Sequence, residues 1–467
     1  MSRPAHPFDG RSGLFTDLYE LTMARAYLAE GMEDTAVFEL FFRELPPTRN
    51  YVLACGLGDV LEYLEGFRFR DDEIEYLHSY REFPADFLKR LADLRFTGDV
   101  HAVPEGTVVF AHEPVLQVIA PITEAQLVET YLLNQVHLQS VAASKASRLV
   151  QAARGRPLVD FGSRRAHGAD AALKVARASY AAGFAGTSNV LAARRYGIPA
   201  HGTLAHSYIQ AHDDEEQALR RFTSLYPNST LLIDTYDTIE GVRRVIALVR
   251  ELGPNHRPHA VRLDSGDLSN LSRQCRRLLD QAGLKDVQIL VSSELDEDAI
   301  DRLLCGGAPV DGFGVGTSLA VSRDTPYLDI VYKLVEYAGR PRLKLSSHKI
   351  LLPGRKQIFR RMRDGRFESD VIGRHDESLD GEPLLVPVMK AGRCLPEMQP
   401  DLETIRERAR RQVESLPPEI RSLDKRSPGY PVRISENLAS DRDRLQASLN
   451  HPSTEGPVGS IPEERVD

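Results

Sequence analysis

A chain of 467 residues is too long for one small hydrophobic core, so two or three domains are expected. A formal net charge of −8, without a long basic run, argues against nucleic acid as a partner. Four widely spaced cysteines indicate neither a disulfide framework nor a zinc knuckle and fit a reducing compartment. Because no apolar stretch resembles a signal peptide or a membrane span, we expect an untargeted cytoplasmic protein with no membrane partner.

The first third of the chain mixes helix-like and strand-like patterns, judged from the spacing of its apolar residues. The expected helices are 17–30, 59–65 and 85–94, and the expected strands are 35–43, 52–55, 105–110 and 115–120. The last two strands are expected to form an antiparallel pair. Residues 1–135 are therefore predicted to form an N-terminal α+β domain.

From residue 124 a long helical pattern runs to about residue 153, and beyond it strand-length apolar runs alternate with helical stretches. This alternation is typical of parallel β/α units, and it fits both a doubly wound sheet and a β/α barrel. The expected strands are 157–161, 183–186, 198–202, 230–234, 259–264, 287–292 and 310–314. The expected helices between them are 170–182, 215–225, 239–252, 268–282 and 296–304.

Polar residues that serve no purpose in a core follow each of these strands at its carboxyl end. They are Arg164, Arg165, Thr187, Ser188, Asn189, His206, Asp234, Asp237, Arg262, Asp264, Ser292, Glu294, Gly314 and Gly316. A barrel directs all its strand ends to one mouth, whereas an open sheet gathers ligands mainly at its switch point. We therefore predict an irregular β/α barrel over residues 136–340. Residues 341–450 are expected to pack on the N-terminal domain, with a disordered tail at 451–467.

His206 lies in a stretch of small or hydroxyl-bearing residues, GTLAHS at 202–207. Gly202 leaves room for a large group to approach the ring, and Thr203 and Ser207 offer hydroxyls that could hydrogen-bond it. A buried structural histidine is the alternative. No metal-ligand spacing such as H-x-x-x-H surrounds His206, which argues against a zinc ligand.

Two carboxylates, Asp234 and Asp237, follow the strand of the next β/α unit after His206. A carboxylate bonded to one ring nitrogen would fix the tautomer and leave the other nitrogen as a nucleophile. The sequence does not decide which aspartate has this role, and it does not identify ligands for magnesium.

Charged and aromatic residues at three other strand ends suggest ligand contacts. Alternation along the strand sends Arg262 and Asp264 to the same side, where they could bind a carboxylate and ribose hydroxyls; a structural ion pair is the alternative. Phe161 could stack on a flat ring while Arg164 and Arg165 bind anionic groups, unless those arginines are simply solvated. The glycine-rich stretch that includes Gly314, Gly316 and Thr317 could cradle a phosphate or form a tight turn.

Several segments, in this order along nearly the whole chain, resemble the nicotinate phosphoribosyltransferase family, type II phosphoribosyltransferases of NAD biosynthesis. They are TDLYELTM at 16–23, DFGSRRAHG at 160–168, GTSN at 186–189, GTLAHS at 202–207, RLDSGD at 262–267 and FGVGT at 313–317. The resemblance implies a cytoplasmic ligase that transfers the phosphoribosyl group of phosphoribosyl pyrophosphate to nicotinate, with ATP hydrolysis and Mg²⁺. It also implies the type II fold, in which an α+β domain of N-terminal and C-terminal parts accompanies the barrel.

The resemblance also implies roles for individual residues. His206 would be phosphorylated by ATP, Arg262 and Asp264 would lie at the base and ribose, and Phe161 against the pyridine ring. By the same mapping, Arg164 would lie near the phosphate or the pyridine carboxylate, and Gly314, Gly316 and Thr317 at the 5'-phosphate. Tyr19 matches a tyrosine that family members lend across a homodimer interface to a shared active site.

Ser188 bears on the choice of substrate, because the related nicotinamide enzyme has an aspartate where this chain has Ser188. A serine suits the anionic nicotinate better than an acid would, which favours nicotinate. The alternatives are a nicotinamide or quinolinate phosphoribosyltransferase and a non-catalytic relative that binds the ligands without turnover.

Overall fold

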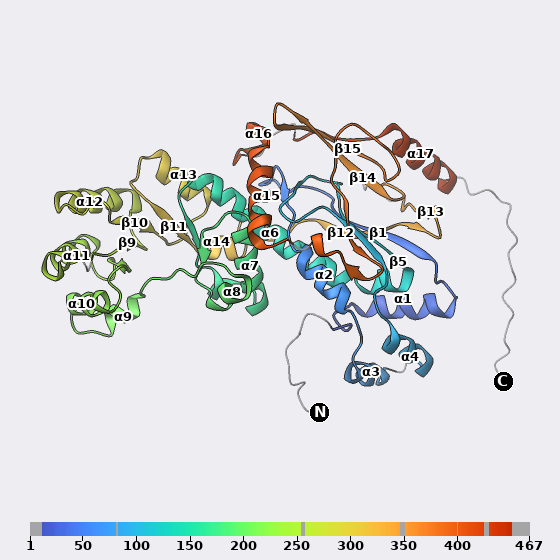
Figure 1. Cartoon of the computed structure of the whole chain (residues 1–467), viewed down its shortest axis with the longest axis horizontal. Helices are drawn as coiled ribbons and strands as arrows, with labels where there is room; N and C mark the ends of the chain where they lie inside the picture. Colours follow the sequence, from blue (N-terminus) through green and yellow to red (C-terminus); the bar gives the residue numbers. More distant parts are fainter. Residues whose placement is uncertain are drawn as a thin grey trace, which may run out of the picture.

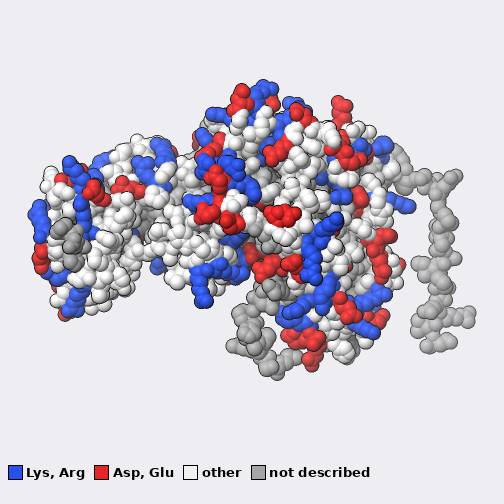
Figure 2. All heavy atoms as spheres, viewed as in Figure 1, with Lys and Arg blue, Asp and Glu red and all other residues white. Residues whose placement is uncertain are grey.

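The computed structural model describes residues 12–80, 83–253, 257–345, 351–398, 400–424 and 429–450, so the tail predicted at 451–467 lies outside the described residues. Two bodies lie side by side along the long axis of the molecule, one built on antiparallel sheets and one on a parallel sheet (Figure 1). Basic and acidic groups intermix over much of the face seen in Figure 2. Among the described residues, no helix has the length and apolar character needed to cross a membrane.

The larger body contains a seven-stranded sheet in the order β13-β12-β1-β5-β3-β17-β18. Its strands are β1 (Thr35–Phe42), β3 (Asp99–Ala102), β5 (Pro114–Pro121), β12 (Ile330–Tyr337), β13 (Arg340–Pro341), β17 (Val386–Lys390) and β18 (Arg393–Cys394). The interior strand β1 is buried at seven of its eight positions, because both faces of the sheet are covered. The sheet therefore joins N-terminal and C-terminal strands, as the predicted fold class requires, although β12 falls within the range 136–340 that was predicted for the barrel.

Smaller sheets and several helices complete this body. The four-stranded sheet runs in the order β16 (Glu382–Pro383), β14 (Lys356–Arg363), β15 (Arg366–Arg374) and β19 (Val432–Ile434). The helices are α1 (Leu18–Ala29), α2 (Leu57–Gly66), α3 (Asp71–His78), α4 (Ala85–Asp93), α5 (Ile122–Leu127), α15 (Leu402–Glu414), α16 (Pro418–Arg421) and α17 (Glu436–Asn450). The expected helices 17–30, 59–65 and 85–94 are thereby confirmed.

The antiparallel pair expected between 105–110 and 115–120 is wrong. The strand β4 (Val108–Val109) pairs with β2 (Val52–Leu53), whereas β5 pairs with β1 and β3. The link between β4 and β5 contains His112 in the left-handed region, with a φ of 67°, and it carries the chain into another sheet.

The smaller body is a curled, all-parallel sheet in the order β7-β6-β11-β10-β9-β8. Its strands are β6 (Leu158–Asp160), β7 (Gly186–Thr187), β8 (Thr230–Leu232), β9 (Ala260–Leu263), β10 (Gln288–Val291) and β11 (Gly312–Val315). The accompanying helices are α7 (Ala169–Ala181), α8 (Val190–Tyr196), α9 (His206–Gln210), α10 (Glu215–Leu225), α11 (Thr238–Leu252), α12 (Leu268–Gln281), α13 (Glu297–Cys305) and α14 (Thr317–Ala320).

One predicted strand of this barrel, 198–202, does not form. Only Ala200 bridges Thr187, and the chain leaves that pairing before Gly202, so β7 and β8 remain at opposite edges of the sheet. The result is a half-barrel with a gap in its wall, which agrees with the irregular barrel of the predicted fold class.

The long helix α6 (Glu129–Ala153) connects the two bodies, and most of its residues are buried. Its Lys145 and Arg148 form buried ion pairs with Glu297 of α13. Lys145 also pairs with Asp324, 2.7 Å away. Because Lys145, Arg148 and Glu297 are buried and mutually paired, they help to orient α6 against the half-barrel.

Glu20 of α1 predicts a measurable pH dependence of stability. Its side chain is buried beside the hydroxyls of Thr16 and Thr130, and burial raises its pKa from 4.5 to about 7. The folded protein holds a proton here that the unfolded chain has already lost. The contribution of this proton to the free energy of unfolding is therefore fully present below about pH 4.5, and it is lost as the pH rises through about 7.

We accordingly expect the Tm of the protein to fall less between about pH 5 and 8 in the Glu20→Gln variant than in the wild type. Glu30→Gln is the matched control, because Glu30 is exposed at the end of the same helix. Thermal unfolding over this pH range measures the difference, and parallel curves for wild type and Glu20→Gln would refute the assignment.

Candidate active site

His206 is the first residue of α9, directly after the loop of small residues that the sequence singled out. Its Nδ1 lies 3.2 Å from the Thr235 hydroxyl, and its Nε2 lies 3.6 Å from a carboxylate oxygen of Asp264. The side chain is 38% exposed. The ring is therefore oriented from both sides and still open to solvent, which rules out the alternative of a sealed core histidine.

Arg262 and Asp264 lie at the carboxyl end of β9, on the same side of the strand, as alternation predicted. The guanidinium Nη2 lies 3.2 Å from Asp264 Oδ2, with the two side chains 15% and 29% exposed. Arg262 also donates to the Thr203 hydroxyl, and Ser292 donates to the other oxygen of Asp264. The pair is only partly buried, so a ligand can reach both charges.

Phe161 closes the other side of this group. The guanidinium carbon of Arg262 lies 5.9 Å from the centre of the Phe161 ring. Gly314 of β11 lies directly behind the ring, where an added Cβ would come within 2.4 Å of Phe161 Cε2. Gly314 is thus needed for the position of Phe161, and the structure brings Phe161, Arg262, Asp264 and His206 together by successive contacts.

Other predicted site residues form no hydrogen bond or ion pair with the His206 side chain within the described part of the chain. Arg164 and Arg165 follow Phe161 on a short 3-10 turn, η1 (Ser163–Arg165), where they are exposed and form no ion pair with another described residue. Ser188 and Ser207 are also exposed. Gly316 and Thr317 begin α14, and a Cβ on Gly316 would lie 3.5 Å from the Phe161 carbonyl oxygen.

Tyr19 lies in the other body, on α1, which is well separated from α9 and β9 in Figure 1. Its hydroxyl hydrogen-bonds to Glu129, and burial together with nearby carboxylates raises its pKa above the usual range. The ring is nevertheless half exposed. Within one chain, Tyr19 therefore does not reach the group around His206.

The expectation that Asp234 or Asp237 orients His206 is wrong for this structure. Asp237 accepts the amides of Ile239 and Glu240 and so caps α11. Asp234 accepts the amide of Asp264 at 2.7 Å and the Ser265 hydroxyl at 2.7 Å, while its second oxygen has no partner among the described residues. The hydroxyl of Thr235, between the two aspartates, holds the ring instead.

Asp160 is a further residue whose role the sequence did not reveal, although it opens the motif that contains Phe161. It is buried at the end of β6, where its carboxylate accepts the Gly162 amide at 2.8 Å and the Thr187 hydroxyl at 2.8 Å. Its carbonyl oxygen accepts the Ser188 amide. Asp160 therefore ties the turn that carries Phe161, Arg164 and Arg165 to the end of β7.

We expect Asp160→Asn to loosen this turn. The carboxylate oxygens of Asp160 now accept hydrogen bonds from the Gly162 amide and the Thr187 hydroxyl, and the asparagine NH₂ group would replace one of these two acceptors with a donor. The loss of one such hydrogen bond to a charged acceptor costs about 1.5–3 kcal/mol of stability, and the loosened turn should lower kcat/KM as well. Thr187→Val should give a smaller loss in the same direction. Steady-state kinetics test this, and wild-type kinetics in a well-folded Asp160→Asn would contradict it.

Comparison with known proteins places these features in a family. Sequence profiles for nicotinate phosphoribosyltransferases match the chain in three parts: the N-terminal domain at residues 14–137, the central family region at 157–363 and the C-terminal domain at 378–442. A nicotinate phosphoribosyltransferase of Mycobacterium tuberculosis is 57% identical over 433 residues, which cover 93% of this chain and 94% of the relative. The chain belongs to the nicotinate phosphoribosyltransferase family.

Other nicotinate phosphoribosyltransferases share less sequence with this chain, and the human one shares its fold. The nicotinate phosphoribosyltransferase of Bacillus subtilis is 41% identical over 387 residues, covering 81% of this chain and 79% of that protein. The crystal structure of human nicotinic acid phosphoribosyltransferase superposes with a TM-score of 0.82 at 31% identity, covering 92% of this chain and 99% of the human chain. The overall architecture of this chain is thus shared with the human member of the family.

Proposed function

We propose that this protein transfers the phosphoribosyl group of phosphoribosyl pyrophosphate to nicotinate, forming nicotinate mononucleotide and pyrophosphate in NAD salvage. We further propose that ATP drives this transfer through a phosphohistidine at His206. The observation that supports the proposal most directly is the exposed imidazole of His206, held between Thr235 and Asp264 beside Arg262. The names of the relatives support nicotinate as the substrate.

The contacts of His206 suggest how it would accept a phosphoryl group. If Nδ1 carries its proton toward the Thr235 hydroxyl, Nε2 keeps a lone pair on the side of the ring that faces Asp264. Attack by Nε2 on the terminal phosphorus of ATP forms the N–P bond, breaks the bond to the bridging oxygen and releases ADP. Later attack by water on the same phosphorus would release inorganic phosphate and restore the imidazole.

The phosphoribosyl transfer needs positioning more than covalent catalysis. The pyridine nitrogen of nicotinate attacks C1' of the ribose as the bond to pyrophosphate breaks, through a transition state with positive charge on the sugar. Asp264 lies where it can bind ribose hydroxyls and stabilise that charge, while Phe161 offers a face for the ring and Arg262 a cation for its carboxylate. Gly316 and Thr317 would lie at the 5'-phosphate by the family mapping.

Magnesium would enter this site together with the substrate phosphates. Among the described residues, no group of three or more His, Cys, Asp or Glu side chains is arranged to hold a metal ion. Mg²⁺ is often held by one or two carboxylates plus substrate phosphates, and Asp264 with the unpartnered oxygen of Asp234 fits that pattern. These two residues are the ligands we propose, and the cation would offset the negative charge of the pyrophosphate.

The position of Tyr19 supports a homodimer with shared sites. Because its half-exposed ring lies on the other body, it can reach a bound pyridine ring only in a second copy of the chain. We propose that Tyr19 of one protomer covers the base bound against Phe161 of its partner.

Parallel assays with nicotinate and nicotinamide, each with and without ATP, test the proposed function. Because Ser188 adds no negative charge and Arg164, Arg165 and Arg262 are cationic, we expect kcat/KM for nicotinate to exceed that for nicotinamide by at least tenfold. ATP should stimulate the nicotinate reaction. A higher kcat/KM for nicotinamide would instead favour a nicotinamide phosphoribosyltransferase, and turnover of quinolinate with release of carbon dioxide would favour a quinolinate phosphoribosyltransferase. Failure to release pyrophosphate with any acceptor would indicate a binding protein.

A further inference from the structure

His201 presents an exposed imidazole beside β7, an edge strand of the half-barrel, directly after the single bridge between Ala200 and Thr187. Its amide donates a hydrogen bond to the Thr187 carbonyl oxygen at 2.9 Å, so the sheet fixes its main chain. Within the described part of the chain, the ring nitrogens of His201 form no hydrogen bond or ion pair. The residue is therefore held at its backbone, and its ring is open to a ligand.

The His201 ring lies on the same face of the sheet as Arg262. Side chains at paired positions of parallel strands point to one face, and positions two apart on a strand share that face. One such row crosses the sheet from β9 to β7: Arg262, Leu290, Gly312, Gly314, Val159 and Gly186. A Cβ added to Gly186 would come within 2.4 Å of His201 Cδ2, so the imidazole occupies the space of the missing side chain.

Phe161 and His201 enclose an open strip of this face. The Phe161 ring covers Gly314 as the His201 ring covers Gly186. These two glycines belong to β11 and β7, which flank β6 in the sheet, so they lie two strand spacings or about 10 Å apart. Val159 of β6, between them, is only half-buried. A flat ring stacked on Phe161 can thus extend a substituent along the sheet toward His201.

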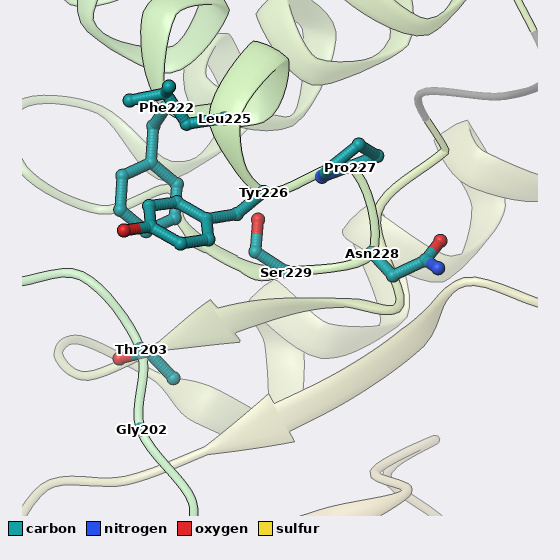
Figure 3. A pocket seen from close by; sticks show the side chains of 8 residues that line it. All are labelled: Gly202, Thr203, Phe222, Leu225, Tyr226, Pro227, Asn228 and Ser229. Atoms are coloured by element: carbon teal, nitrogen blue, oxygen red, sulfur yellow. The ribbon is translucent and has the colours of Figure 1, made fainter.

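The chain after His201 leads directly to Arg262. Thr203, two residues further on, accepts a hydrogen bond from the Arg262 guanidinium. This stretch does not pack against α10, because Figure 3 shows Thr203 opposite the aromatic side chains of α10 across a cavity of about 630 Å³. Since two residues span at most about 7 Å, the imidazole and the guanidinium border the same part of the mouth.

A planar anion fits between these groups. Its ring would lie against Phe161, and its negative charge would face Arg262 on one side and His201 on the other. Imidazole carries an N–H donor in either protonation state, and a hydrogen bond to a carboxylate is stronger than one to a neutral amide. We propose that His201 donates a hydrogen bond to the carboxylate of nicotinate and helps to select the acid over the amide. This inference rests on the proposed transfer to nicotinate and adds a specificity-determining residue to it.

Steady-state kinetics of His201→Leu test this role, because leucine fills similar space without a donor. Loss of a hydrogen bond to a charged group should raise KM for nicotinate at least about tenfold, with kcat and KM for phosphoribosyl pyrophosphate near the wild-type values. The preference for nicotinate over nicotinamide, as a ratio of kcat/KM values, should fall by a similar factor. His201→Gln keeps an N–H donor and should recover part of the loss.

Two further variants complete the experiment. His201→Glu should lower the preference for nicotinate below that of His201→Leu, because its carboxylate repels the substrate's. His78→Leu is the matched control, since His78 is an exposed histidine of α3 in the other body, and it should behave as the wild type.

The outcomes separate this role from the proposed function. If the wild type preferred nicotinate and His201→Leu kept both that preference and the KM for nicotinate, only the role of His201 would be wrong. It would also be wrong if His201→Leu lowered kcat and raised both KM values together, as a structural role predicts. If the wild type used nicotinamide better than nicotinate, the proposed function and the role of His201 would both fail.

Discussion

His206→Ala is expected to abolish stimulation of the transfer reaction by ATP while a slow, ATP-independent transfer remains. The imidazole is the proposed phosphoryl acceptor, but it forms no bond to the sugar, and the residues placed at the ribose and base are untouched. With ATP present, the rate of the variant should therefore equal the rate of the wild type without ATP. Initial rates with and without ATP, at fixed nicotinate and phosphoribosyl pyrophosphate, measure this.

Thr235→Val provides the matched control for the role of the ring nitrogens. It removes the hydroxyl that bonds Nδ1 but keeps the side-chain volume, so ATP stimulation should be reduced rather than lost. If His206→Ala kept full ATP stimulation, the phosphoryl acceptor would have to be another group.

Asp264→Ala is expected to lower kcat/KM about a hundredfold or more, both with and without ATP. This carboxylate contacts Arg262, Ser292 and the His206 ring, so its removal leaves a guanidinium without its partner in the site. Truncating one member of such a charge pair costs about 2–5 kcal/mol, and about 2.8 kcal/mol corresponds to a hundredfold. Steady-state kinetics with each substrate varied in turn would show losses in both binding and turnover.

Asp296→Ala is the control for this substitution, because Asp296 caps α13 through the Ala299 amide and lies outside the group around His206. It should cost about 1 kcal/mol of stability without a comparable loss of activity. If a folded Asp264→Ala variant kept the wild-type kcat/KM, Asp264 would not be part of the active site.

The sequence predicted the parallel sheet and the grouping of its strand ends well, because each signal is local. Val261 and Leu263 are buried while Arg262 and Asp264 face the mouth, so one alternating run sufficed to predict the orientation of both charged residues. The common direction of parallel strands accounts for the placement of Arg262, Asp264 and Thr235, whereas His206 follows no strand and is brought to them by the loop before α9.

Strand pairings and side-chain contacts that depend on tertiary packing could not be predicted from local patterns. The link after β4 looks like a hairpin in sequence, yet β4 pairs with β2, more than fifty positions earlier in the chain. Two-residue strands such as β2 and β4 are too short to show alternation. Thr235 was overlooked because a carboxylate is the more familiar partner of an activated histidine, and only the path of the chain after β8 shows that Asp237 caps a helix.

Phosphate on His206 is the most direct test of the central claim. The wild-type protein would be incubated with ATP labelled in its terminal phosphate, and the modified residue located by peptide mapping. We predict acid-labile phosphate on His206 and none in the His206→Ala variant. The claim would be contradicted by label that is acid-stable, that lies on another residue or that persists in His206→Ala. It would also be contradicted if ATP stimulated the wild-type transfer reaction but left no label on the protein.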